Sequence, residues 1–130
     1  DALLEPTQIY VKTILSLLKT AAPRTQVSGL AHITGGGLHD NIERILPSDC
    51  HLVIDRKSWP VPPLFRWLQE LGSIDREEMF HVFNMGIGFV VIVRPDASDA
   101  VRKHLADADV THWTIGEMRS TDKRGVELVN

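Results

Sequence analysis

The chain has 130 residues, of which 43% are hydrophobic and 24% charged, which is the size and composition of one soluble domain with one hydrophobic core. The formal net charge is −3 and no run of lysine or arginine occurs, so we predict no nucleic-acid partner and no membrane anchor. The longest apolar stretch, residues 87–93, is too short to span a bilayer, and the first residues lack a signal-peptide pattern. Cys50 is the single cysteine and excludes a disulfide within the chain, so we expect a cytoplasmic protein.

Helices and strands are predicted to alternate in the first half of the chain. A helix opens at residues 6–7 and ends before Pro23, because apolar side chains recur there at helical spacing. Residues 27–33 are predicted as a strand that is apolar on both faces, and three glycines then lead into a second helix that Pro47 ends. Residues 51–55 form a short strand. Four apolar residues of the second helix are predicted to face inward: Leu38, Ile42, Ile45 and Leu46.

Two further helices are predicted before the next strand. Pro63 starts a helix that ends at Gly72. Asp75 with Glu78 resembles a capping box, so a short helix follows and ends near residue 83. The first of these helices is predicted to bury an apolar face made of Leu64, Trp67, Leu68 and Leu71.

The last third of the chain is predicted to supply strands. Residues 89–93 are the strongest candidate, and a helix follows to about residue 108. Residues 111–118 and 126–129 are the final strands, and the short turn between them predicts that they pair antiparallel. Strands interleaved with helices predict an α/β (α+β) fold in which helices pack on a mixed sheet.

The most informative stretch is residues 32–37, His-Ile-Thr-Gly-Gly-Gly, which joins a strand to a helix. The first amides of a helix lack partners and the dipole is positive there, so bare glycine backbone can approach a phosphate closely. His32 and Thr34 share one strand face just before the loop, where ligands gather in sheets. Glycines also serve tight turns and close packing, so a structural role stays open. The spacing matches neither a Walker loop nor a dinucleotide fingerprint.

A second glycine-containing segment, residues 83–88 (Phe-Asn-Met-Gly-Ile-Gly), precedes the strand at residues 89–93. Its glycines would permit a bulge or close packing, with Asn84 capping the turn. Alternatively, Asn84 presents a donor and an acceptor to a ligand beside the glycine loop, and the residues alone do not choose. The histidines lack the short spacing of a metal site, so no metal site is predicted. Core or domain-contact roles are favoured for the three tryptophans, Trp59, Trp67 and Trp113.

Taken together, these segments resemble one family, phosphoribosylformylglycinamidine cyclo-ligase, also called aminoimidazole ribonucleotide synthetase, in its C-terminal domain. The similarity runs in order over essentially the whole chain. It implies that residues 1–130 are a single C-terminal domain of a larger two-domain enzyme, whose N-terminal ATP-binding domain is absent here. The start at Asp1, without an initiator methionine, fits this expectation. The matching segments are residues 32–37, 41–42, 44–47, 67–69, 78–79 and 83–88.

The resemblance implies an ATP-dependent cyclisation of formylglycinamidine ribonucleotide to aminoimidazole ribonucleotide, with release of ADP and phosphate, in purine biosynthesis. ATP and Mg²⁺ would be bound mainly by the missing domain, so this chain alone is expected to be inactive. The implied partners are the small-molecule substrate, the N-terminal domain of the same chain and a second copy in a cytoplasmic homodimer.

The resemblance also implies site residues. His32 would be catalytic, exchanging protons with or polarising the substrate amide. The chain departs from the family pattern at His81 and Val82, where the family usually has arginine and threonine, so the family arginine's role does not carry over. The substrate- or phosphate-binding residues would be Thr34, Gly35, Gly36, Gly37, Asn84 and Gly86.

Two alternatives stay open at this point. Relatives with the same two-domain plan include formylglycinamidine ribonucleotide synthetase, selenophosphate synthetase, thiamine monophosphate kinase and a hydrogenase maturation factor. A chain of this kind could also be a binding module without catalysis. A domain rich in glycine and acidic residues upstream in the reading frame would favour the enzyme.

Overall fold

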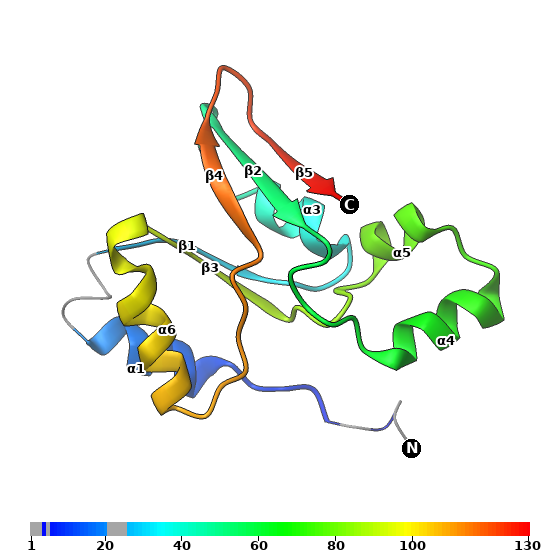
Figure 1. The fold of residues 1–130 in the computed structure, drawn as a ribbon, viewed down its shortest axis with the longest axis horizontal. Helices are drawn as coiled ribbons and strands as arrows, with labels where there is room; N and C mark the ends of the chain where they lie inside the picture. Colours follow the sequence, from blue (N-terminus) through cyan, green and yellow to red (C-terminus); the bar gives the residue numbers. More distant parts are fainter. Residues whose placement is uncertain (1–3, 5, 21–25) are drawn as a thin grey trace. The chain divides into compact units, whose positions relative to one another are not determined.

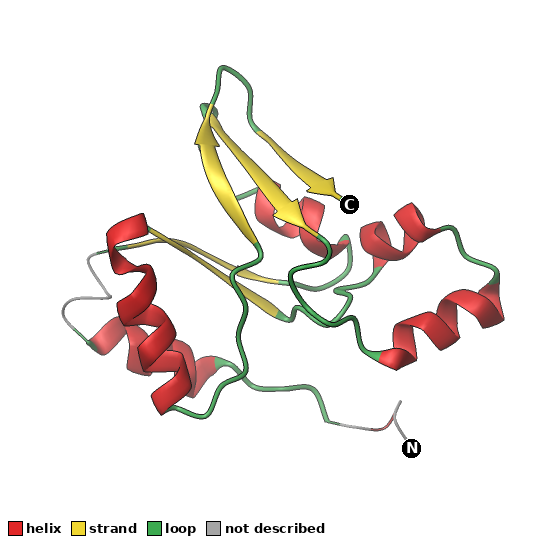
Figure 2. Cartoon of the chain, viewed as in Figure 1, coloured by secondary structure: helices red, strands yellow, loops and turns green. Residues whose placement is uncertain are grey.

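The computed structural model describes residue 4, residues 6–20 and residues 26–130. The chain divides into two compact units. Unit 1 comprises Asp1–Leu30 and Val91–Trp113, and unit 2 comprises Ala31–Val90 and Thr114–Asn130. The predicted mixed α/β architecture is confirmed, because helices and strands alternate along the chain and one sheet contains both parallel and antiparallel pairs (Figures 1 and 2).

The structure contains a two-stranded sheet. Its strands are β1 (Val27–His32) and β3 (Phe89–Val93). The N–H of Ile33 donates to the carbonyl of Gly88 at 3.0 Å, and the N–H of Arg94 donates to the carbonyl of Gln26 at 3.0 Å. The residue after β1 is thus hydrogen-bonded to the residue before β3, and the residue after β3 is hydrogen-bonded to the residue before β1. This pattern shows that the two strands run antiparallel.

In the described part of unit 1, two helices pack on each other, α1 (Val11–Lys19) and α6 (Ser98–Asp107). A 3₁₀ turn, η2 (Pro95–Ala97), leads into α6. The first helix begins at Val11, later than predicted. Ile9 is 80% exposed, so extending the helix toward the N-terminus would bury no apolar surface that could offset the ordering of those residues. The predicted end before Pro23 lies outside the described residues.

Unit 2 contains a three-stranded sheet in the order β4-β2-β5 (Figure 1). The central strand β2 (Cys50–Asp55) pairs antiparallel with β4 (Gly116–Ser120) and parallel with β5 (Gly125–Val129). The predicted antiparallel pairing of the last two strands with each other is therefore wrong. Their connection passes over the start of β2, where the N–H of Thr121 donates to the carbonyl of Asp49 at 2.9 Å. The inserted β2 carries two buried apolar residues, so a central position keeps them covered.

Three helices complete unit 2. α3 (Gly37–Glu43) packs against β5 and against α5 (Arg76–Val82), while α4 (Pro63–Gly72) contacts α5. The side chain of Asp75 caps α5 by accepting from the N–H of Glu77 at 2.8 Å, as the predicted N-terminus requires. The largest fully buried side chains of this unit are Leu38, Ile42, Ile54 and Met79.

The apolar face of α4 is not buried as predicted. No residue of α4 is buried, and Trp67 and Leu71 are 49% and 69% exposed. The helix contacts its neighbours through another side, where the ring of Phe65 lies 6.0 Å from that of Phe83. A helical pattern shows that an apolar face exists, but the neighbouring elements decide whether it is covered. Ile45, also predicted to face inward, is 38% exposed; it lies beyond α3, which ends at Glu43.

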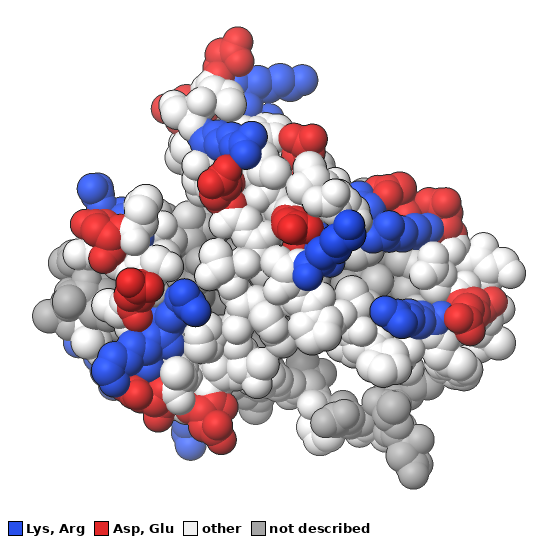
Figure 3. All heavy atoms as spheres, viewed as in Figure 1, with Lys and Arg blue, Asp and Glu red and all other residues white. Residues whose placement is uncertain are grey.

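No helix in the described part of the chain has the length and apolarity that crossing a membrane requires. On the face drawn in Figure 3, basic and acidic side chains are interspersed.

Candidate functional site: a glycine loop beside an asparagine turn

The structure brings the two glycine-containing segments together. The loop of residues 33–37 leaves the end of β1, and the turn of residues 84–88 enters the start of β3. The hydrogen bond from Ile33 to Gly88 joins them directly. The rings of His32 and Phe89 stack beside this bond, with centroids 6.1 Å apart and an interplanar angle of 23°. Segments far apart in sequence therefore meet because β1 and β3 are neighbouring strands.

His32 and Thr34 lie on the exposed side of the strand end. Burial alternates along it, because Ala31 is 4% and Ile33 2% exposed, whereas His32 and Thr34 are exposed. Side chains two residues apart on extended backbone share a face. The two polar side chains thus share the exposed face at the start of the glycine loop, and the hydroxyl of Thr34 donates to Oδ1 of Asn41 at 3.3 Å.

Asn41 holds the glycine loop in shape. It is 4% exposed, and its side-chain Nδ2 donates to three loop carbonyls, those of Thr34 at 3.2 Å, Gly35 at 3.2 Å and Gly37 at 2.7 Å. Its Oδ1 accepts from the hydroxyl of Thr34 at 3.3 Å. The sequence analysis assigned Asn41 no role. The available signal was a polar amide next to Leu38 and Ile42 on the predicted inner face of the second helix.

The three glycines have different local roles. Gly37 has a φ of 58°, and a Cβ there would collide with the carbonyl oxygen of Phe80, so this glycine lets α3 approach α5. Its N–H donates to the carbonyl of Thr34 at 3.1 Å. Gly36 is the N-cap of α3, and a Cβ on Gly35 would meet nothing within 4 Å. Open space therefore lies beside Gly35, while Gly37 is committed to packing.

The asparagine turn is self-capped. The Oδ1 of Asn84 accepts from the N–H of Gly86 at 3.0 Å, which is the capping role considered from the sequence. Gly86 has a φ of 98°, and a Cβ there would lie 2.5 Å from Cδ of Pro62. The indole Nε1 of Trp59 donates to the carbonyl of Met85 at 3.0 Å. The Asn84 cap, the close approach of Gly86 to Pro62 and the buried indole therefore fix the backbone beside Asn84, whose Nδ2 donates to none of the described residues.

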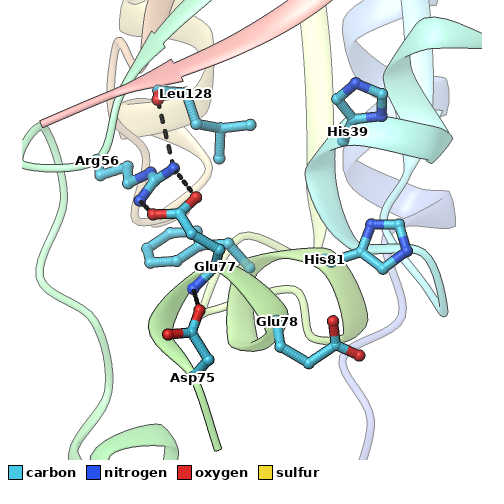
Figure 4. Close-up of a pocket in the computed structure, with 8 residues that line it drawn as sticks. His39, Arg56, Asp75, Glu77, Glu78, His81 and Leu128 are labelled. Carbon is cyan, nitrogen blue, oxygen red and sulfur yellow. Dashed lines mark hydrogen bonds and ion pairs between the residues drawn. The ribbon is translucent and has the colours of Figure 1, made fainter.

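A pocket of about 450 Å³ opens on α3 and α5, next to the packing contact of Gly37 (Figure 4). None of the predicted site residues lines it. Three acidic side chains, two imidazoles, one guanidinium and two apolar side chains line it. The lining residues are His39, Arg56, Asp75, Glu77, Glu78, Phe80, His81 and Leu128.

Arg56 forms one side of this pocket and ties three elements together. Its side chain is 9% exposed and pairs through both Nη atoms with the carboxylate of Glu77 (Figure 4). Nη2 also donates to the carbonyl of Leu128 at 3.3 Å, and the guanidinium lies 4.8 Å from the ring centroid of Phe80. The hydrogen bond from Arg56 lowers the pKa of Glu77 below its ordinary 4.5. The guanidinium of Arg56 is therefore already paired with Glu77 inside the protein, and it does not offer an unpaired positive charge to a ligand.

His39 and His81 form another side of the pocket. The Nδ1 of His39 lies 3.0 Å from Oδ1 of Asp40 and 3.7 Å from Oε2 of Glu43. The hydrogen bond from His39 lowers the pKa of the Asp40 carboxyl, and the charge of His81 acts in the same direction. Within the described residues, no group of three or more histidine, cysteine, aspartate or glutamate side chains could hold a metal ion.

Comparisons with known proteins agree with the resemblance in the sequence. A family model described as AIR synthase related protein, C-terminal domain, matches residues 1–129. Phosphoribosylformylglycinamidine cyclo-ligase of Cupriavidus pinatubonensis is 48% identical over 119 residues, which are 92% of this chain and 33% of that protein. The protein of the same name in Burkholderia mallei (strain SAVP1) is 50% identical over 130 residues, or 99% of this chain and 36% of the relative. The chain thus spans about a third of the length of the curated relatives that it matches.

The solved structures support the fold. The crystal structure of E. coli HypE, a hydrogenase maturation protein, aligns with a TM-score of 0.65 and 23% identity. The alignment covers 95% of this chain and 37% of HypE. At that identity the likeness concerns the fold alone.

Proposed function

Because the chain belongs to the family of AIR synthase related proteins, C-terminal domain, we propose that it is the C-terminal domain of a phosphoribosylformylglycinamidine cyclo-ligase. The observation that carries the proposal is the 48–50% identity to cyclo-ligases over nearly the whole chain, including both segments that meet at the ends of β1 and β3. The proposed reaction is the ATP-dependent closure of formylglycinamidine ribonucleotide to aminoimidazole ribonucleotide, a step of purine biosynthesis.

In this reaction ATP would phosphorylate the formyl oxygen of the substrate. The amidine nitrogen then attacks the formyl carbon, the carbon–oxygen bond to phosphate breaks, and phosphate and ADP leave. The nitrogen must lose a proton as the ring forms, so one positioned acid–base group is needed. His32, which is exposed at the end of β1, is our candidate for that group.

The glycine loop is proposed to hold a phosphate group of the substrate or of ATP. Gly35 and Gly36 are the suitable glycines, because open space lies beside Gly35 and neither N–H donates to a described residue. The N–H of Gly37 already donates to Thr34, so Gly37 would contribute by positioning α3. Thr34 and Asn84 would contact substrate from either side, with Gly86 holding the turn of Asn84.

ATP and Mg²⁺ are proposed to bind mainly to a domain that precedes this one in the longer protein. The described residues offer no three-ligand group for a metal ion, so no step here is assigned to Mg²⁺. Magnesium would neutralise phosphate charge during transfer, whereas this chain's residues would bind, orient and exchange a proton. We further propose that the longer protein is a cytoplasmic homodimer and that this domain alone is inactive.

The experiment uses the longer protein carrying His32→Ala. One positioned acid–base group contributes roughly 10²–10⁴-fold in rate, so kcat for aminoimidazole ribonucleotide formation should fall by that factor. The urea midpoint of unfolding should stay near that of the parent, because His32 is exposed.

His51→Ala is the matched control, since His51 lies on β2 and its Nε2 is 3.7 Å from the Glu127 carboxylate. It should leave kcat unchanged. Near-parental turnover of the His32→Ala protein would reject the role of His32. No ATP-dependent product from the unmodified longer protein would reject the cyclo-ligase assignment itself.

A further inference from the structure

The outward face of α4 carries apolar side chains at helical spacing. Leu64, Trp67 and Leu71 recur at i, i+3 and i+7, which places them along one side of the helix. Trp67 is 49% exposed and Leu71 is 69% exposed. Leu64 is half-buried, and the ring of Phe65 faces Phe83 from another side, so Trp67 and Leu71 are the uncovered part of the stripe.

The composition of this face is that of an interface. Tryptophan combines a large apolar area with few rotatable bonds, and it is enriched where proteins bind each other. Two exposed side chains of opposite charge, Arg66 and Glu70, lie one helical turn apart on a different side of α4 from the stripe. In Figure 3 the surface over α4, as located from Figure 1, carries a basic patch beside an acidic one, with uncharged atoms around them.

We propose that this face, whose exposed apolar residues are Trp67 and Leu71, docks onto the domain that precedes this one in the longer protein. The inference rests on the proposed function in one respect, namely that such a domain exists. The curated relatives are about three times as long as this chain, and the matching family model is that of a C-terminal domain.

The size of the face favours a partner on the same chain over a second copy. α4 has ten residues and is therefore about 15 Å long and about 10 Å across, a projected area on the order of 150 Å². A stable complex between separate proteins takes about 800 Å² from each partner. A tethered domain has a high effective concentration and needs less contact area from any one helix.

The test compares two cysteine positions on α4 in the longer protein, with Cys50→Ser as background. Leu71→Cys probes the proposed face, and Arg66→Cys probes a side of the same helix that is also exposed. Maleimide labelling is followed peptide by peptide by mass spectrometry, in native buffer and in urea.

Docking predicts that the Leu71→Cys protein labels at least about tenfold more slowly than the Arg66→Cys protein in native buffer. A tenfold difference corresponds to a free energy of about 1.4 kcal/mol for undocking the face before the cysteine can react. In urea the two rates should be equal. Equal rates in native buffer would overturn the proposal.

Photo-crosslinking identifies the occupant and does not depend on how the cysteine variants fold. With p-benzoylphenylalanine at position 71 of the longer protein, docking predicts cross-links to peptides of the preceding domain. Covalent dimers that join α4 to α4, or no cross-link at all, would overturn it.

These outcomes separate the two proposals. Slow labelling and the expected cross-links in a protein that makes no aminoimidazole ribonucleotide would refute the proposed function and leave the docking intact. An active enzyme in which the cysteine at position 71 labels as fast as the cysteine at position 66 would refute the docking and leave the proposed function intact.

Discussion

Replacing Asn41 with alanine tests whether one buried amide holds the glycine loop. The variant removes a side chain that donates to the carbonyls of Thr34, Gly35 and Gly37 and accepts from the Thr34 hydroxyl. The hydrogen bond to Gly37 is buried and 2.7 Å long, whereas the other two donated bonds are partly buried. Alanine leaves all three carbonyls without this donor.

The expected cost follows from these differences in burial. The buried carbonyl of Gly37, without its side-chain donor, costs about 1–3 kcal/mol, and the partly buried carbonyl of Gly35, which water can reach, costs about 0.5–1 kcal/mol, whereas the carbonyl of Thr34 keeps the N–H of Gly37 as a donor. The free energy of unfolding should therefore fall by about 1.5–4 kcal/mol in total. Urea unfolding followed by circular dichroism measures this change. Arg44→Ala, an exposed position just after α3, is the control and should change stability by less than about 0.5 kcal/mol.

Asn41→Asp sharpens the test by keeping the shape and removing the donor. A carboxylate facing three carbonyl oxygens is disfavoured, so its pKa in the folded protein should lie above that in the unfolded chain. The destabilisation should then grow as pH rises above about 3.9 and shrink at lower pH, where the protonated acid can donate. A loss below about 1 kcal/mol for Asn41→Ala, or a pH-independent loss for Asn41→Asp, would refute the assigned role.

Three further variants test the remaining contacts. Gly37→Ala should cost more than about 2 kcal/mol of unfolding free energy, because it combines a positive φ with a clash against the backbone of α5, and a soluble variant of parental urea midpoint would contradict this. Glu77→Gln should lower the thermal midpoint at neutral pH by removing the charge opposite the buried Arg56. Because the pKa of Glu77 is lowered in the folded state, the difference in thermal midpoint between the parent and the variant should be complete above pH 4.5, the ordinary pKa. It should disappear as the pH falls through the lowered pKa of the folded protein, and melting curves across this pH range check this. Trp59→Phe leaves the Met85 carbonyl without its donor and should cost about 1–3 kcal/mol by urea titration.

The order of elements could be predicted because it depends on local properties. The pattern of apolar residues and the capping signals located α4, α5 and β3 closely, and the helix after β3 was also expected. The pairing of the strands was harder to predict from the sequence. The sequence shows that two strands are joined by a short turn, but not that a third strand, β2, lies between them.

The candidate site shows the same division. The exposed side of β1 that carries His32 and Thr34 followed from period-two alternation, and the glycine loop followed from composition. The different roles of Gly35 and Gly37 did not, because they depend on the backbone of α5, which is distant in sequence. Asn41 was missed for a related reason, since its hydrogen bonds are visible only when the loop has folded back over α3.

The sequence by itself determined the family of this chain, its mixed α/β class and the two segments proposed to face the substrate. Those conclusions depend on residue types and spacings that are complete within short stretches. Only the tertiary structure decided that the two segments are joined at Ile33 and Gly88, that Asn41 supports the loop, and that the apolar face of α4 is left uncovered. Burial and hydrogen bonding belong to pairs of residues that the fold brings together, so a pattern along one segment cannot fix them.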